Sequence, residues 1–134
     1  MMFDEQQPGF TFAQLDNGIH EFHWNSTERV AVDDWMQYND DLYARTSIDQ
    51  TLYFLHIINS TRFPPLSYVI RKARYLQMKY PKQPSTRSAI LFHSRFFSSM
   101  FNTMSNMLNR KGKDVTRFFL MNERDEAIGW LLEE

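Results

Sequence analysis

Short apolar segments that alternate with longer segments of helical period constrain the fold of this sequence most strongly. Residues 51–58 (TLYFLHII) are apolar at both parities, which is typical of a strand covered on both faces, and residues 88–93 (SAILFH) and 115–121 (VTRFFLM) are also short and apolar. Helices are predicted at 30–45, 65–80, 96–109 and after Asn122. This alternation predicts a mostly parallel sheet with right-handed crossovers.

The N-terminal part of the sequence predicts an antiparallel hairpin. Residues 9–15 and 18–24 are rich in aromatic side chains and flank Asp16-Asn17-Gly18, in which Asn-Gly favours a tight turn. The second hairpin strand then starts the first of four β/α units. We therefore expect an α/β fold, in which an N-terminal β-hairpin is followed by four β/α units in a mostly parallel five-stranded sheet. One domain is expected over residues 1–134, with residues 1–8 as a flexible N-terminus.

Composition excludes several classes of function. The 15 basic and 16 acidic side chains give a net charge of −1, which argues against a nucleic-acid binder and against attachment to acidic membranes. The absence of cysteine excludes disulfides and thiolate catalysis. The first residues, MMFDEQQPGF, have neither the basic start nor the apolar stretch of a secretion signal, and no apolar run is long enough for a transmembrane segment. We expect a cytoplasmic protein.

Two segments resemble a known family. Residues 55–66 (LHIINSTRFPPL) stand where STAS-like sequences, named for sulphate transporters and anti-sigma-factor antagonists, carry an Asp-Leu-Ser-Gly-Val type strand end. Residues 122–131 (NERDEAIGWL) are similar to the last helix of bacterial STAS-like proteins. The resemblance implies a STAS-like regulatory domain that binds a protein or a small ligand. It does not extend to the family's phosphorylated serine, because Pro64, Pro65 and Leu66 occupy that region and Ser67 falls one place later.

Polar residues gather where the predicted parallel strands end, and ligands bind at this edge of open sheets. Two arginines, several hydroxyl groups and free helix N-termini could hold an anion or a phosphate group, as an anionic small ligand would supply. The alternative is that these side chains cap helices and close turns. The candidate rim residues are Asn59, Ser60, Thr61, Arg62, Ser67, His93, Ser94 and Arg95.

No catalytic or metal-binding motif stands out. His56 and His93 end neighbouring predicted strands and could share a metal or relay a proton, but no third ligand is evident, and a histidine in an apolar strand is more often a core or rim residue. The adjacent pairs Asp33-Asp34 and Asp40-Asp41 point apart on a helix and indicate a solvated face. The sequence therefore predicts no catalytic residue, no metal site and no cofactor.

The predicted helix 96–109 has an apolar stripe wider than one sheet face requires, and it carries no charged side chain from Phe96 to Asn109. Methionine and phenylalanine suit adaptable contacts, which indicates a surface for a protein partner or for self-association. Core packing, or a role as the wall of an apolar pocket, is the alternative. The candidate interface residues are Phe97, Met100, Phe101, Met104, Met107 and Leu108.

Three functions follow from these features. The leading hypothesis is a non-enzymatic regulatory or scaffold module that binds protein through helices 65–80 and 96–109. The first alternative is a small-ligand or lipid carrier of Sec14-like topology, in which helix 96–109 lines an apolar pocket. The second alternative is an enzyme that uses the serine, histidine and arginine residues of the rim. The basic cluster at 71–82 is interpreted as a solvated face, with an acidic partner or phospholipid headgroup as the alternative.

Overall fold

The computed structural model describes residues 9–60 and 62–133, so the predicted flexible segment 1–8 and the candidate rim residue Thr61 lie outside the described residues. The chain folds in the order β1 (Phe10–Gln14), β2 (His20–Trp24), α1 (Arg29–Arg45), β3 (Thr51–Ile58), α2 (Leu66–Lys79), β4 (Ser85–Phe92), a 3₁₀ turn (Arg95–Phe97), α3 (Ser98–Leu108), β5 (Asp114–Leu120), a second 3₁₀ turn (Met121–Glu123) and α4 (Arg124–Leu131). Across the described ranges, none of the helices has both the length and the hydropathy needed to cross a bilayer.

The five strands form one sheet whose spatial order, β1-β2-β3-β4-β5, is the same as their order in the sequence. β1 is antiparallel to β2, and every other pair is parallel. The predicted α/β class, the hairpin and the mostly parallel five-stranded sheet are therefore confirmed. The predicted neighbours, strands 51–58 and 88–93, lie side by side as β3 and β4, with His56 opposite Ile90.

The turn between β1 and β2 explains why the hairpin forms at this point in the sequence. Gly18 has φ of +89°, a left-handed conformation that glycine adopts without steric cost. Its backbone N–H donates to the carbonyl of Leu15, and the N–H of Leu15 donates to the carbonyl of Ile19, each at 2.9 Å. The side chain of Asn17 accepts from the N–H of Ile19 at 3.1 Å. These bonds fix the register in which Phe12 faces Phe22.

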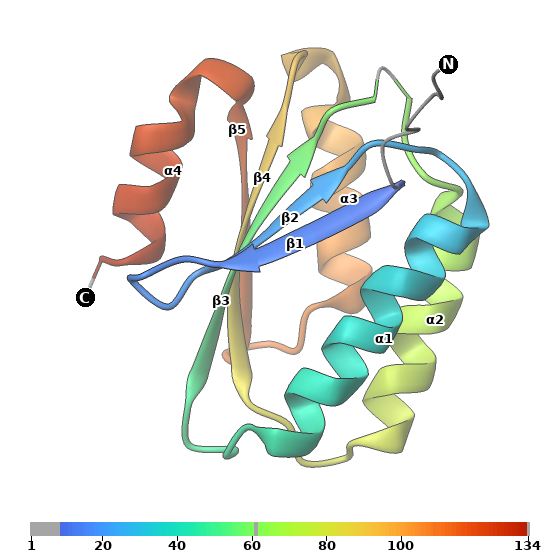
Figure 1. Ribbon diagram of the computed structural model, residues 1–134, viewed down its shortest axis with the longest axis vertical. Coiled ribbons are helices and arrows are strands. Elements are labelled where there is room, and N and C mark those ends of the chain that lie inside the picture. Colours follow the sequence, from blue (N-terminus) through green and yellow to red (C-terminus); the bar gives the residue numbers. More distant parts are fainter. Residues whose placement is uncertain (1–8, 61, 134) are drawn as a thin grey trace, which may run out of the picture.

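The helices are divided unequally between the two faces of the sheet. Helices α1, α2 and α3 cover one face, called the front face here, and α4 alone covers the other, the back face (Figure 1). The front core is rich in aromatic side chains, including Phe22, Trp24, Phe54, Phe92 and Phe101. The back core is smaller and mainly aliphatic, with Ile19, Leu55, Leu91, Ala127 and Leu131. Because strand side chains alternate in direction, β3 and β4 contribute to both cores.

Two element boundaries differ from the sequence prediction in a way that matters for the site. β4 begins at Ser85 rather than at residue 88, because parallel pairing with β3 already starts where Thr51 faces Ser85. The predicted helix 96–109 is a 3₁₀ turn followed by α3, and the hydroxyl of Ser94 caps this turn by accepting from the N–H of Phe96 at 3.1 Å. The front face of β4 therefore includes Thr86 and Ser88 as well as its apolar half.

α4 attaches to the back face through both apolar and polar contacts. Ala127 and Leu131 are fully buried against the sheet. From β4, the guanidinium of Arg87 lies 4.0 Å from the centre of the Trp130 ring and its Nε donates to the Trp130 carbonyl at 3.0 Å. The single helix is thus held at its C-terminal half by a buried leucine and by an arginine from the sheet.

We expect Leu131→Ala to lower the free energy of unfolding by about 3 kcal/mol, since it removes a fully buried side chain from the back core. Leu132→Ala is the matched control, because Leu132 is 44% exposed and its truncation should change the free energy by less than about 0.5 kcal/mol. Urea denaturation of both variants measures the difference. Equal effects would show that α4 does not pack on the sheet as described.

Candidate functional site

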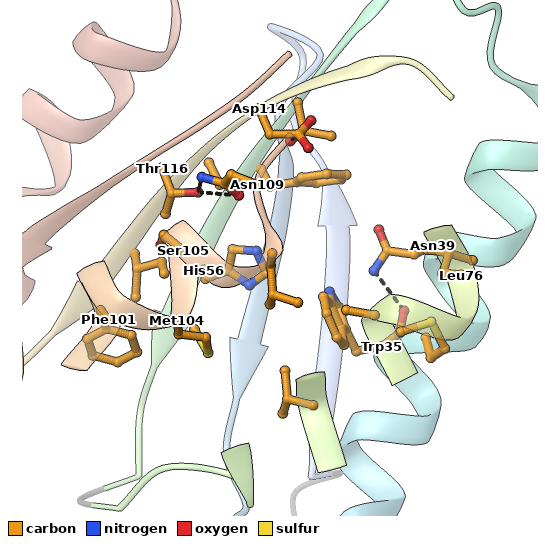
Figure 2. Close-up of a pocket in the computed structure, with 18 of the residues that line it drawn as sticks. Trp35, Asn39, His56, Leu76, Phe101, Met104, Ser105, Asn109, Asp114 and Thr116 are labelled. Carbon is orange, nitrogen blue, oxygen red and sulfur yellow. Dashed lines mark hydrogen bonds between the residues drawn. The ribbon is translucent and has the colours of Figure 1, made fainter. Parts of the chain in front are cut away.

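A cavity of about 170 Å³, partly open to solvent, lies between the front face of the sheet and helices α1, α2 and α3 (Figure 2). Native cores rarely contain voids larger than a water molecule, so a space of this size is an unusual feature of the packing. Its walls come from all three helices and from strands β2 to β5.

Small side chains at inward-facing positions create the cavity. On the front face of β4, Thr86, Ser88 and Ile90 line the cavity, and Ile90 and Phe92 also belong to the buried front core. α2 places Ala73 opposite this part of the sheet, and α3 contributes Ser105. The sheet and helices cannot close around such short side chains, because the larger residues elsewhere on the same elements set the distance between the layers.

The wall of the cavity is mainly aromatic and aliphatic, with a smaller polar part towards the start of β4 and β5. The apolar lining is formed by Trp24, Trp35, Met36, Tyr43, Phe54, Ile58, Phe63, Pro64, Leu66, Val69, Ala73, Leu76, Ile90, Phe101, Met104 and Leu108. The polar lining is formed by Asn39, His56, Gln77, Gln83, Thr86, Ser88, Ser105, Asn109, Asp114 and Thr116. An apolar pocket with a few convergent polar groups is the usual form of a small-molecule site.

His56, on the front face of β3, is the histidine that faces this cavity (Figure 2). Its Nδ1 accepts a hydrogen bond from the indole Nε1–H of Trp24 at 3.1 Å. The neutral ring therefore carries its proton on Nε2, because an imidazole nitrogen that accepts cannot also hold the proton. Among the described residues, no hydrogen-bond partner meets Nε2. Burial lowers the pKa of His56 to about 4, so the ring is a neutral donor at neutral pH.

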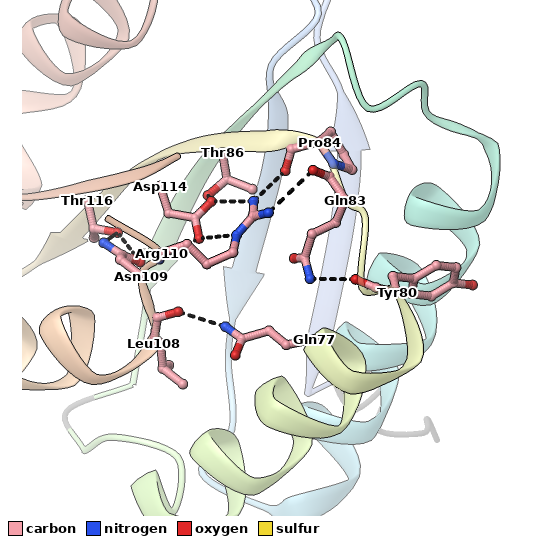
Figure 3. A network of polar contacts seen from close by, with 10 residues as sticks. All are labelled: Gln77, Tyr80, Gln83, Pro84, Thr86, Leu108, Asn109, Arg110, Asp114 and Thr116. Atoms are coloured by element: carbon pink, nitrogen blue, oxygen red, sulfur yellow. Dashed lines mark hydrogen bonds and ion pairs between the residues drawn. The ribbon is translucent and has the colours of Figure 1, made fainter. Parts of the chain in front are cut away.

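A polar network closes the end of the cavity near the start of β4 and β5 (Figure 3). Arg110 donates from Nε and from one terminal nitrogen to the two carboxylate oxygens of Asp114, at 3.0 and 2.9 Å, and to the Pro84 carbonyl at 2.8 Å. Thr86 donates to the same carboxylate at 3.0 Å. The Asp114 hydrogen bonds raise the pKa of Arg110. Asp114 is therefore compensated by a fixed cation and offers no free charge to the cavity.

A second polar contact joins the two helices on either side of the cavity. The side-chain amide of Gln77, on α2, donates to the carbonyl of Leu108, at the end of α3, at 2.7 Å (Figure 3). Asn109, which follows α3, donates to the hydroxyl of Thr116 on β5 at 3.0 Å. The C-terminal end of α3 is thus tied both to α2 and to the sheet.

The rim residues after β3 take structural roles or remain exposed. The amide of Asn59 donates to Asn25 at 2.7 Å and lies 3.1 Å from His23 Nδ1. The hydroxyl of Ser60 donates to the backbone carbonyl of Arg62. Arg62 and Ser67 are exposed. The Asn59 and Ser60 contacts are those expected if these polar residues close turns.

The rim residues after β4 are similar. Ser94 caps the following 3₁₀ turn, Arg95 lies 3.4 Å from the Glu123 carboxylate, and His93 is exposed and packs on Phe92. Neither Ser60 nor Ser94, of the described rim serines, hydrogen-bonds a histidine that could activate it. The binding role predicted for the rim stays a prediction.

His56 and His93, considered as a pair from the sequence, face different surroundings. His56 points into the cavity, whereas His93 is an exposed residue beyond the end of β4. Residues 9–60 and 62–133 contain no group of three or more histidine, aspartate or glutamate side chains placed to hold a metal ion.

The candidate interface residues divide between the core and the surface. Phe101 is 4% exposed and packs with Phe63 and Phe118, while Phe97 and Met104 lie against the front core. Met100 and Leu108 are half-buried, and Met107 is 50% exposed. Phe101, Met104 and Leu108 also line the cavity. This position corresponds to the alternative in which the helix forms the wall of an apolar pocket. Contact with a partner stays a prediction, and it can involve only the exposed part of α3.

Hydrophobic periodicity does not predict the cavity. It places Ser88 at the start of an apolar strand and Trp24 in a hairpin. The sequence feature that indicates the cavity is the series of alternate residues Thr86, Ser88, Ile90 and Phe92, which share one face of the strand. The first two are small and polar, and the last two are large and apolar.

No protein-family model, curated protein or solved structure matches this chain in the three comparisons made.

We expect His56 to make the protein less stable in acid. The folded pKa of about 4 lies below the ordinary value of 6.5, so the unfolded chain takes up the proton first as the pH falls. The contribution of His56 to stability is complete above about pH 6.5 and is lost as the pH falls towards 4, by about 2 kcal/mol between pH 7.5 and 5.

Urea denaturation at both pH values tests this expectation. His56→Gln should lose less stability on acidification than the wild type, by about 2 kcal/mol, while the exposed control His93→Gln should follow the wild type. The pKa of His20 is also lowered, by burial and then by Arg45, but His20 is present in all three proteins. If the free energy of unfolding of His56→Gln falls as much between pH 7.5 and 5 as that of the wild type, His56 is not held neutral in the folded protein.

Proposed function

We propose that this protein is a binding module that holds a small, largely apolar molecule in the cavity between the sheet and helices α1, α2 and α3. The observation that carries the proposal is the 170 Å³ cavity itself, with its mainly apolar wall. An engineered apolar cavity of about 150 Å³ in another protein is large enough to bind benzene. The proposal corresponds to the carrier alternative from the sequence, with a ligand of small size.

The energetic cost of an empty cavity supports this proposal. Apolar side chains that line unfilled space lack dispersion contacts on that side. Ser88 and Ala73 are among the short side chains that line this space. A ligand that fills the space would recover dispersion contacts with the wall.

Entry of the ligand is expected between α2 and α3. The cavity lining includes Ala73 and Gln77 of α2 and Met104 and Leu108 of α3, so the wall on this side is made of helix side chains rather than of the sheet. The hydrogen bond from Gln77 to the Leu108 carbonyl spans the two helices here. A local separation of α3 would break this contact without disturbing strand pairing.

Regulatory binding of a protein partner is our second candidate, and one observation favours it. Large apolar side chains are strongly exposed on or beside the two helices predicted to bind: Met78 is 81% exposed, Phe96 83% and Met107 50%. A cytoplasmic module could combine such a surface with an internal ligand site.

The STAS-like kinship is likewise a proposal. Successive β/α units after an N-terminal strand are the order of elements that resembles this family, and the observed order of strands and helices supports the proposal. Pro64 and Pro65 stand near the family's phosphorylated position, so regulation through a phosphoserine there is not part of the proposal.

Ser88→Leu should weaken binding of α-methylstyrene, a one-ring apolar probe, because a larger side chain on the sheet would occupy part of the cavity. Ser67→Leu introduces the same side chain at an exposed position of α2 and is the matched control. Ligand-observed NMR measures both. Binding is expected in the wild type and in Ser67→Leu, with at least a tenfold weaker affinity in Ser88→Leu, equivalent to about 1.4 kcal/mol. Equal binding by all three proteins would place the probe outside the cavity.

Self-association tests the second candidate directly. If the exposed apolar side chains form a contact between two copies, sedimentation velocity should show dimers at about 100 μM for the wild type and monomers for Met78→Lys combined with Phe96→Ser. Gln37→Lys, at an exposed position of α1, serves as the charge control. A monomeric wild type at this concentration would count against self-association through these residues.

A further inference from the structure

We infer that the cavity selects a neutral, single-ring aromatic molecule that carries a hydrogen-bond acceptor, such as a carbonyl oxygen, directed at Nε2 of His56. This inference rests on the proposed function and specifies the ligand class of the same site. Three properties of the cavity lead to it: the direction of the free donor, the nature of the wall, and the absence of an uncompensated charge.

The free donor requires an acceptor. The Trp24 indole N–H donates to Nδ1 of His56 at 3.1 Å, so the proton of the imidazole is on Nε2. No described residue accepts a hydrogen bond from Nε2–H. His56 is half-buried, and a ligand oxygen in the cavity would accept a hydrogen bond from this N–H. The Trp24–His56 bond fixes which ring nitrogen faces the cavity, so the site prefers an acceptor to a donor at this point.

The wall around His56 favours an aromatic ring. Trp24, Trp35 and Phe54 surround the imidazole, with ring centres 6.3, 6.2 and 6.1 Å from it, and all three line the cavity. Aromatic rings pack favourably with one another at separations of about 4.5–7 Å. A volume of 170 Å³ accommodates one ring with a small substituent, because a cavity of about 150 Å³ holds benzene.

Charge balance favours a neutral ligand. Of the described residues that line the cavity, none is a lysine or an arginine, and the one carboxylate among them, Asp114, is already paired with Arg110. A charged ligand would lose its hydration without gaining a counter-ion, and such burial is strongly unfavourable. His56 does not supply a positive charge, since burial keeps the pKa of its ring near 4. An acidic or basic aromatic molecule is therefore discriminated against.

Acetophenone and α-methylstyrene form a matched pair of probes, because they differ mainly in the replacement of C=O by C=CH₂. The quantity measured is the dissociation constant of α-methylstyrene divided by that of acetophenone, determined by ligand-observed NMR at pH 7.5. We expect this ratio to fall about tenfold from the wild type to His56→Phe, which removes the donor. His93→Phe makes the same exchange at an exposed histidine and should leave the ratio unchanged. His56→Gln keeps an N–H donor and should retain most of the preference.

A measurement on the wild type alone avoids any folding defect, since His56→Phe leaves the Trp24 N–H without its acceptor. In ¹⁵N-resolved spectra, the His56 Nε2–H proton should lie further downfield with acetophenone bound than with α-methylstyrene bound, because the two probes share the phenyl ring and only acetophenone accepts a hydrogen bond. The ligand class is wrong if both probes bind but either the ratio is the same in His56→Phe or the resonance has the same position with both probes. Failure of the proposed function looks different: neither probe then binds the wild type.

Discussion

A change in side-chain size along the front face of β4 determines how the sheet and its helices can pack. Ile90 and Phe92 join a dense aromatic core, whereas Thr86 and Ser88 leave space in front of the first half of the strand. The layers cannot approach locally, because the aromatic half holds them apart. The cavity is therefore a consequence of how residues are distributed within one strand.

Polar contacts at the ends of α3 keep this helix from closing the space. At its C-terminal end, Arg110 joins the β5 carboxylate of Asp114 to the Pro84 carbonyl, and Gln77 holds the Leu108 carbonyl. At its N-terminal end, the Ser94 hydroxyl caps the preceding turn. Since both ends are fixed, the middle of α3 spans the cavity and places Ser105 and Met104 in its wall. His56 faces the same space with Nε2–H, because the Trp24 indole N–H is hydrogen-bonded to its Nδ1.

Much of the fold could be predicted from the sequence, but the site could not. Apolar runs such as residues 51–58 identify covered strands, and short connections make successive strands neighbours, so the sheet order follows from general rules. The cavity depends on side-chain volume at single positions, which hydrophobic periodicity does not measure. The polar start of β4 therefore falls outside the predicted strand. Polar residues such as Ser94 predict a site at the rim, where Ser94 instead caps a 3₁₀ turn, while Ser88 lines the cavity.

A crystal structure determined under xenon pressure tests the central claim most directly. If the space beside Ser88 and His56 is an accessible apolar cavity, anomalous density for xenon should appear there, as it does in dry engineered cavities of similar size. Ordered water molecules that fill the space and bridge His56 to Ser88 and Ser105, with no xenon bound, would contradict an apolar ligand site.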